Sequence, residues 1–142
     1  MYEKIIDILE GNNIKNNLDF LEVTPEDFNK FREKEGRYNK ANLYFLMQEK
    51  LMDFERDKEY VKAAYIAHLI SYYLHIVFTP INNFELSLKY ARKSIEYDNK
   101  KIDYKEWILI FSESLTENEV FNYLQEVIKN KPDSNLAKLM SL

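Results

Sequence analysis

Cysteine is absent from this sequence of 142 residues, and glycine and proline occur only two and three times. The lack of cysteine excludes disulfide bonds, thiolate zinc sites and a cysteine nucleophile. Scarce glycine and proline leave little material for β-turns, and abundant Leu, Lys, Glu, Ile and Tyr favour long helices. The sequence also has no glycine-rich phosphate loop, no GxSxG motif and no dinucleotide-binding fingerprint. These absences argue against the enzyme classes that such motifs mark.

The chain shows no sign of export or membrane insertion. Its first residues, MYEKIIDILEGNN, are interrupted by Asp7 and Glu10, which predicts no signal peptide and a cytoplasmic location. The longest apolar stretch runs from Tyr60 to Phe78, near the lower length limit for a membrane span. Because two histidines and a serine lie within it, this stretch is better interpreted as the central helix of a protein core.

Negative charge is concentrated in the first part of the chain. Residues 1–60 contain 14 acidic and 10 basic residues, whereas residues 61–142 contain 10 of each. A nucleic-acid-binding protein needs a cationic face, so this distribution argues against nucleic acid as a partner. It suits a basic protein partner, although an acidic surface also serves simply to keep a protein soluble.

Apolar residues recur at helical spacing throughout, which predicts an all-α fold of seven to nine helices in one domain, residues 1–142. Thr24 before Pro25 marks a helix start, Pro80 a helix end, and Thr116 with Glu119 a capping box. N-terminal helices are expected over residues 1–58 and helix pairs over 59–142. The expected helices lie near 2–10, 14–23, 25–35, 39–56, 58–78, 83–98, 103–115 and 117–130, with a short helix in the tail.

The second half of the chain contains a degenerate repeat with an offset of 33 residues. Under this offset Ile95 aligns with Ile128, and Leu74 aligns with Trp107. The units, about 66–99 and 100–132, are each long enough for one pair of helices. A helix pair buries one face within itself and the other against the next pair, so the same positions need apolar residues in every unit. The alternative is a generic helical bundle with coincidental spacing.

This repeat resembles the tetratricopeptide-repeat superfamily over about residues 60–142. The resemblance implies a right-handed stack of antiparallel helix hairpins that binds other proteins. The sequence departs from the family pattern at Asn99, which replaces the closing proline found at Pro132. It departs again at His75 and Ile108, where the family has a small residue.

The segments KYARKSIEYDN, DYKEWILIF and ENEVFNYLQEVIKNKPDSNLAKLM together are similar to small repeat proteins that serve as immunity partners of bacterial polymorphic toxins. The resemblance implies a non-catalytic protein that binds and neutralises a cognate toxin domain. The alternative is an adaptor, or a subunit of a larger complex, built on the same scaffold.

The two histidines, His68 and His75, lie on one line of the central helix with Ser71 and Tyr72. Seven residues separate them, about 10 Å along a helix, which is too far for one metal ion, so no metal or cofactor is expected. The polar line needs solvent, an internal acceptor or a ligand. Carboxylate pairs lie on polar faces and are interpreted as solvated. An enzyme with either histidine as a base is the minor alternative.

Trp107 is expected to be buried between the last two helix pairs. Two surfaces are candidates for binding a partner protein. The first surface is a groove formed by first-helix side chains that point away from their own repeat core. Its residues are Tyr72, Ile76, Thr79, Lys105, Leu109 and Ser112, flanked by His68 and Glu113. If the N-terminal helices cover this face, the acidic residues Glu49, Asp53 and Asp57 form the binding surface instead.

Overall fold

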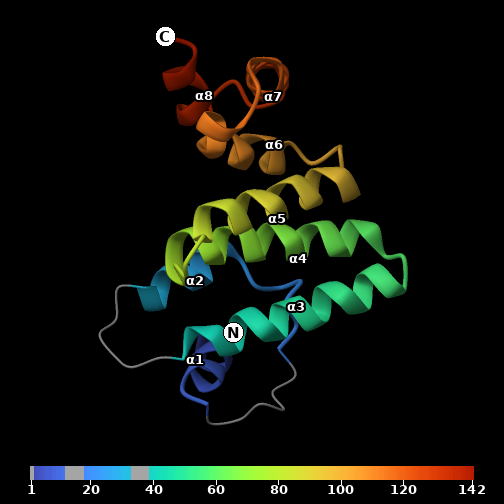
Figure 1. Cartoon of the computed structure of the whole chain (residues 1–142), viewed down its shortest axis with the longest axis vertical. Coiled ribbons are helices and arrows are strands. Elements are labelled where there is room, and N and C mark those ends of the chain that lie inside the picture. Colours follow the sequence, from blue (N-terminus) through green and yellow to red (C-terminus); the bar gives the residue numbers. More distant parts are fainter. Residues whose placement is uncertain (1, 12–17, 33–38) are drawn as a thin grey trace.

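A computed structural model describes residues 2–11, 18–32 and 39–142, and these ranges are helical without a strand (Figure 1). This confirms the all-α prediction. The helices are α1 (Tyr2–Leu9), α2 (Pro25–Arg32), α3 (Lys40–Arg56), α4 (Tyr60–Tyr72), α5 (Asn83–Tyr97), α6 (Ile102–Ile108), α7 (Glu117–Asn130) and α8 (Asn135–Met140). A π-helical turn, η1 (Tyr73–Val77), extends α4, and a 3₁₀ segment, η2 (Leu109–Ser114), extends α6.

Helices α3 to α7 are stacked in chain order along the long axis of the molecule (Figure 1). Helix α4 packs between α3 and α5, α5 packs on α6, and α6 packs on α7. The N-terminal helices close one end, with α1 against α3 and α2 against η1. Figure 1 shows α7 along its axis, whereas α3, α4 and α5 lie in the plane of the picture. Helix α7 is therefore turned steeply relative to the three central helices.

The central position of α4 follows from its sequence. Small and aliphatic side chains surround its axis, so it can be buried against a helix on each side. Seven of its residues are buried: Ala63, Ala64, Ile66, Ala67, Leu69, Ile70 and Ser71. Most of these belong to a core shared with α1, α2 and α3, while Ala64 belongs to the core formed with α5 and α6. Within the described ranges, no helix combines the length and apolarity that crossing a bilayer requires.

Local signals set several helix ends as predicted. Phe78 is extended and ends the helical run two residues before Pro80, as expected for the residues that lead into a proline. The Thr116 side chain accepts a hydrogen bond from the Glu119 amide, and the Glu119 side chain returns one to the Thr116 amide. Gly11, with φ of 75°, follows α1 in the left-handed conformation that favours glycine.

Other boundaries differ from the predictions. Residues 18–23 form turns rather than the end of a helix over 14–23, because the Asp19 carboxylate accepts a hydrogen bond from the Leu21 amide. The start of that predicted helix, at 14–17, and the end of the predicted helix over 25–35 lie outside the described residues. The predicted helix over 103–115 is α-helical only to Ile108 and continues as η2.

Candidate partner-binding groove

The polar line on α4 begins with Ser71, which is fully buried and satisfied internally. Its hydroxyl donates to the Ser87 carbonyl oxygen over 2.7 Å and accepts from the Trp107 indole nitrogen over 2.8 Å. The Ser87 hydroxyl in turn donates to the Ser71 carbonyl oxygen. These bonds tie α4 to α5 and α6 at one point, so Ser71 holds the helices together and is not available to a ligand.

The Trp107 indole lies between the two histidines of the chain. Ring centroids are 6.1 Å apart for His68 and Trp107, and 5.9 Å apart for His75 and Trp107. His68 also packs on Tyr104 at 4.9 Å, and His75 on Phe111 at 5.2 Å. Among the described residues, the Nδ1 atoms of both histidines are buried without a hydrogen-bond partner.

Burial makes both histidines weak bases. It lowers the pKa of His68 to about 4, an effect that Asp103 opposes and Lys101 reinforces. Burial also lowers the pKa of His75. Both imidazoles are therefore neutral at pH 7.

A groove of about 710 Å³ opens beside His68, between α2, α4, α6 and α8. Its floor is largely aromatic, and Tyr72 and Trp107 pack together there with centroids 5.2 Å apart. The rim is charged and comes from three separate parts of the chain. The lining residues are Pro25, Glu26, Tyr65, His68, Tyr72, Lys101, Asp103, Tyr104, Glu106, Trp107, Ile110, Lys131, Asn135 and Leu136.

The charges on the rim are partly paired. The Lys131 ammonium lies 3.1 Å from an Asp103 oxygen and 2.8 Å from a Glu106 oxygen. The Glu106 and Asp103 carboxylates raise the pKa of Lys131. Glu26 and Lys101 are exposed, and neither has an ion pair within the part of the chain that the structure describes. One carboxylate and one ammonium thus remain available to a bound molecule.

Two of the groove residues predicted from the sequence, His68 and Tyr72, do line this groove. Tyr72 is partly covered by α2, because its ring stacks on Phe28 at 6.4 Å and its hydroxyl donates to the Asn29 side chain over 2.6 Å. The N-terminal helices therefore cover one edge of the groove and leave the rest of it open.

The placement of Lys105 and Leu109 in the groove is wrong. Lys105 of α6 and Leu109 of η2 both face helices α7 and α8. Lys105 is 7% exposed and its ammonium lies 2.7 Å from the Glu126 carboxylate. Leu109 is 1% exposed and packs with Val127 and Ala137. The turn of α7 away from the central helices brings its residues onto this face of α6 (Figure 1).

The remaining predicted groove residues lie elsewhere. Ile76 packs against the N-terminal core. Thr79 and Glu113 are exposed and Ser112 is half-buried, and none of the three lines the groove. Trp107 is half-buried rather than buried, since one part of its indole forms the groove floor.

The sequence contained a signal for the residues of α6 that the groove uses. Tyr104, Trp107 and Phe111 form an apolar stripe at helical spacing, and this stripe packs on His68 of α4 and His75 of η1. Ile110, three residues after Trp107 and beside this stripe, lines the wall of the groove. No local signal pointed to the rim, because Lys131 meets Asp103 only after α6 and α7 have packed.

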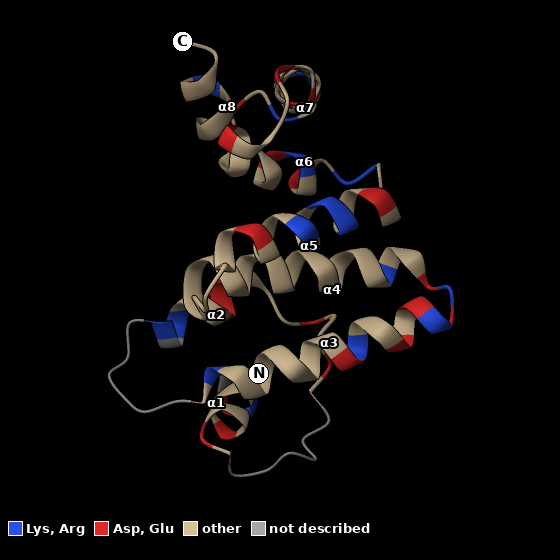
Figure 2. Ribbon diagram, viewed as in Figure 1, with Lys and Arg blue, Asp and Glu red and all other residues tan. Residues whose placement is uncertain are grey.

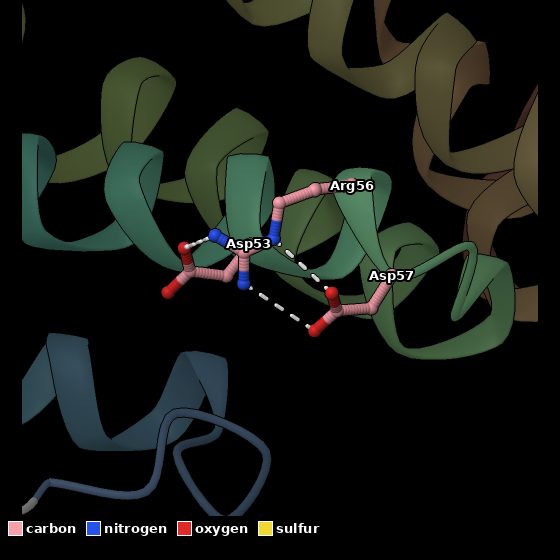
Figure 3. Close-up of polar contacts among 3 residues, drawn as sticks. All are labelled: Asp53, Arg56 and Asp57. Carbon is pink, nitrogen blue, oxygen red and sulfur yellow. Dashed lines mark hydrogen bonds and ion pairs between the residues drawn. The ribbon is translucent and has the colours of Figure 1, made fainter.

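The three predicted acidic residues are on or just after α3. Figure 3 shows Arg56 between two of them, with Nη1 at 3.4 Å from Asp53 and Nε at 3.1 Å from Asp57. Their charges are partly neutralised. Glu49 instead lines a small cleft of about 180 Å³ between α1 and α3, with Ile8, Asn42, Phe45 and Leu46.

Within the described ranges, no group of three or more His, Asp or Glu residues could hold a metal ion.

In the described residues these features define a protein of packed helices with an aromatic groove at one side. A scan against protein-family models, a search of curated proteins and a search of solved structures each returned no match to this chain.

Proposed function

We propose that this chain is a non-catalytic protein-binding module and that the groove beside His68 receives a segment of its partner. One observation carries the proposal: an open groove combines a floor of Tyr and Trp side chains with a rim of mixed charge. Protein interfaces have this composition, with rigid aromatic anchors at the centre and polar groups around them.

The surroundings of His68 support a binding role over a catalytic one. A general base works best with a pKa near the operating pH, and the pKa of His68 is lowered to about 4. Its closest ring neighbours are Tyr104 and Trp107, which pack on the imidazole and do not activate it. In this proposal His68 therefore forms part of the groove floor.

The partner that we propose is a toxin domain, which this chain would bind and neutralise in the cytoplasm as an immunity protein. The support is the resemblance of the segments between residues 89 and 140 to such proteins, together with the helical-hairpin fold. We also propose that the hairpins are degenerate tetratricopeptide-like units in a right-handed stack. Helices α5 and α7 end at Tyr97 and Asn130, 33 residues apart, which agrees with the repeat offset.

The test begins with the tagged chain as bait in an extract of the source organism, followed by purification of the captured partner. Affinity is then measured for Ile110→Ala and for Lys101→Glu, and for Ile81→Ala as a control. Ile81 is 90% exposed and does not line the groove. The groove variants are expected to weaken binding by about tenfold, and the control is expected to bind normally. Equal affinity for all three variants would refute the proposal that the partner binds in the groove.

The immunity role has its own test. The partner is expressed in a bacterial host with and without this chain, and growth is followed. We expect the partner to arrest growth when alone and the chain to restore it. A partner that is harmless alone would leave an adaptor as the function.

A further inference from the structure

Helix α3 exposes two large apolar side chains on the surface opposite its buried face. Phe45 is 64% exposed and Met52 is 62% exposed, whereas Leu43, Met47 and Leu51 are buried. Seven residues are about two helical turns, so Phe45 and Met52 lie on one line about 10 Å apart. Single exposed apolar residues are ordinary, but two on one line at this spacing provide a pair of anchors.

The surface around Phe45 has a cleft as well as apolar side chains. The small cleft between α1 and α3 lies beside its ring, with Ile8 and Leu46 as apolar walls. The Asn42 side chain donates to the Ile8 carbonyl oxygen over 3.3 Å and links the two helices at this point. The cleft is therefore a feature of the packed helices and can accept part of an apolar side chain.

The same face carries an exposed carboxylate. Glu49 is exposed, lies one turn from Phe45 towards Met52, and forms no ion pair within the described residues. The lysines of α3 are engaged elsewhere: Lys50 lies over the Phe54 ring at 4.9 Å, and Lys40 donates to the Val77 carbonyl oxygen over 3.3 Å. Figure 2 shows acidic and basic positions interspersed on both α1 and α3.

We propose that this surface, formed by Ile8, Phe45, Leu46, Glu49 and Met52, is a second docking site, and that its occupant is a cationic amphipathic helix of a partner protein. A helix laid along α3 can place apolar side chains on the two anchors and in the cleft. A Lys or Arg on that helix faces Glu49, and the excess of acidic residues over residues 1–60 attracts it. This site is separate from the groove and does not depend on it.

The probe is a synthetic amphipathic peptide of about 18 residues, five helical turns, with Leu on one face and Lys on the other. A second peptide carries Glu in place of every Lys. Binding is measured by fluorescence anisotropy, and the site is located from amide chemical shifts of the ¹⁵N-labelled chain. We expect the cationic peptide alone to bind, with the largest shifts between residues 42 and 53.

Substitutions test whether the peptide binds to this surface or to another part of the chain. Phe45→Ala with Met52→Ala is expected to weaken peptide binding about tenfold or more, with an unchanged circular dichroism spectrum. Glu49→Lys is expected to weaken binding most at low salt. The matched controls are Val61→Ala and Glu96→Lys, since Val61 is 68% exposed and Glu96 is exposed on α5. Both controls are expected to bind like the unmodified chain.

Three outcomes would overturn the inference. The first is that the largest shifts fall on groove residues such as Tyr104 and Ile110. The second is that the Glu-containing peptide binds equally well. The third is that light scattering shows a dimer which Phe45→Ala with Met52→Ala converts to a monomer, because a second copy of the chain would then be the occupant.

Discussion

Lowering the pH from 7 to 5 is expected to destabilise this protein through His68. Its imidazole packs on Tyr104 and Trp107, and its Nδ1 atom is buried without a hydrogen-bond partner among the described residues. Protonation would place a positive charge there. Burial disfavours the protonated imidazole, so the pKa of His68 in the folded state falls from 6.5 to about 4. In the unfolded chain the imidazole keeps a pKa near 6.5.

The direction of the change in stability follows from the number of protons that each state binds. Between the two pKa values the unfolded state binds more protons than the folded state, so stability falls as the pH falls. With 1.36 kcal/mol per pKa unit, the change between pH 7 and pH 5 is about 2 kcal/mol for His68. The pKa of His75 is also lowered by burial, which adds a loss of the same sign. The carboxyl groups of an unfolded chain titrate mainly below this window.

The assay is urea unfolding followed by circular dichroism at pH 7, 6 and 5 and at constant ionic strength. His68→Phe keeps an aromatic ring against Tyr104 and removes the titrating group. This variant is expected to lose about 2 kcal/mol less than the unmodified chain between pH 7 and pH 5. His75→Phe measures the contribution of the second histidine. Identical pH slopes for the unmodified chain and His68→Phe would show that His68 is not desolvated as described.

Two further variants test the packing and the capping. Trp107→Ala is expected to cost about 3 kcal/mol, because the half-buried indole contacts both histidine rings and donates to Ser71; an unchanged urea midpoint would contradict this. Glu119→Ala is expected to cost about 1 kcal/mol, since its carboxylate accepts from the Thr116 amide and pairs with Arg92. The exposed Glu117→Ala is the control, and an equal loss there would show that the cap is not responsible.

The sequence by itself determined most of the helices and many of their ends. The apolar stretch from Tyr60 to Phe78 predicted a central helix, because side chains that are apolar all round can only be buried on several sides. The capping box at Thr116 and the stop before Pro80 were predicted for the same kind of reason. Both depend on hydrogen bonds and steric contacts between residues close together in the chain.

Only the tertiary structure decided which faces meet and which remain open. The repeat offset placed Lys105 and Leu109 in a groove, but α7 crosses the central helices steeply and its residues bury both (Figure 1). The same packing brings Lys131 to Asp103 and opens the groove beside His68. Helical periodicity defines the apolar face of each helix. The angle at which two helices cross depends on how their side chains interdigitate across the interface, and these contacts join residues far apart in the sequence.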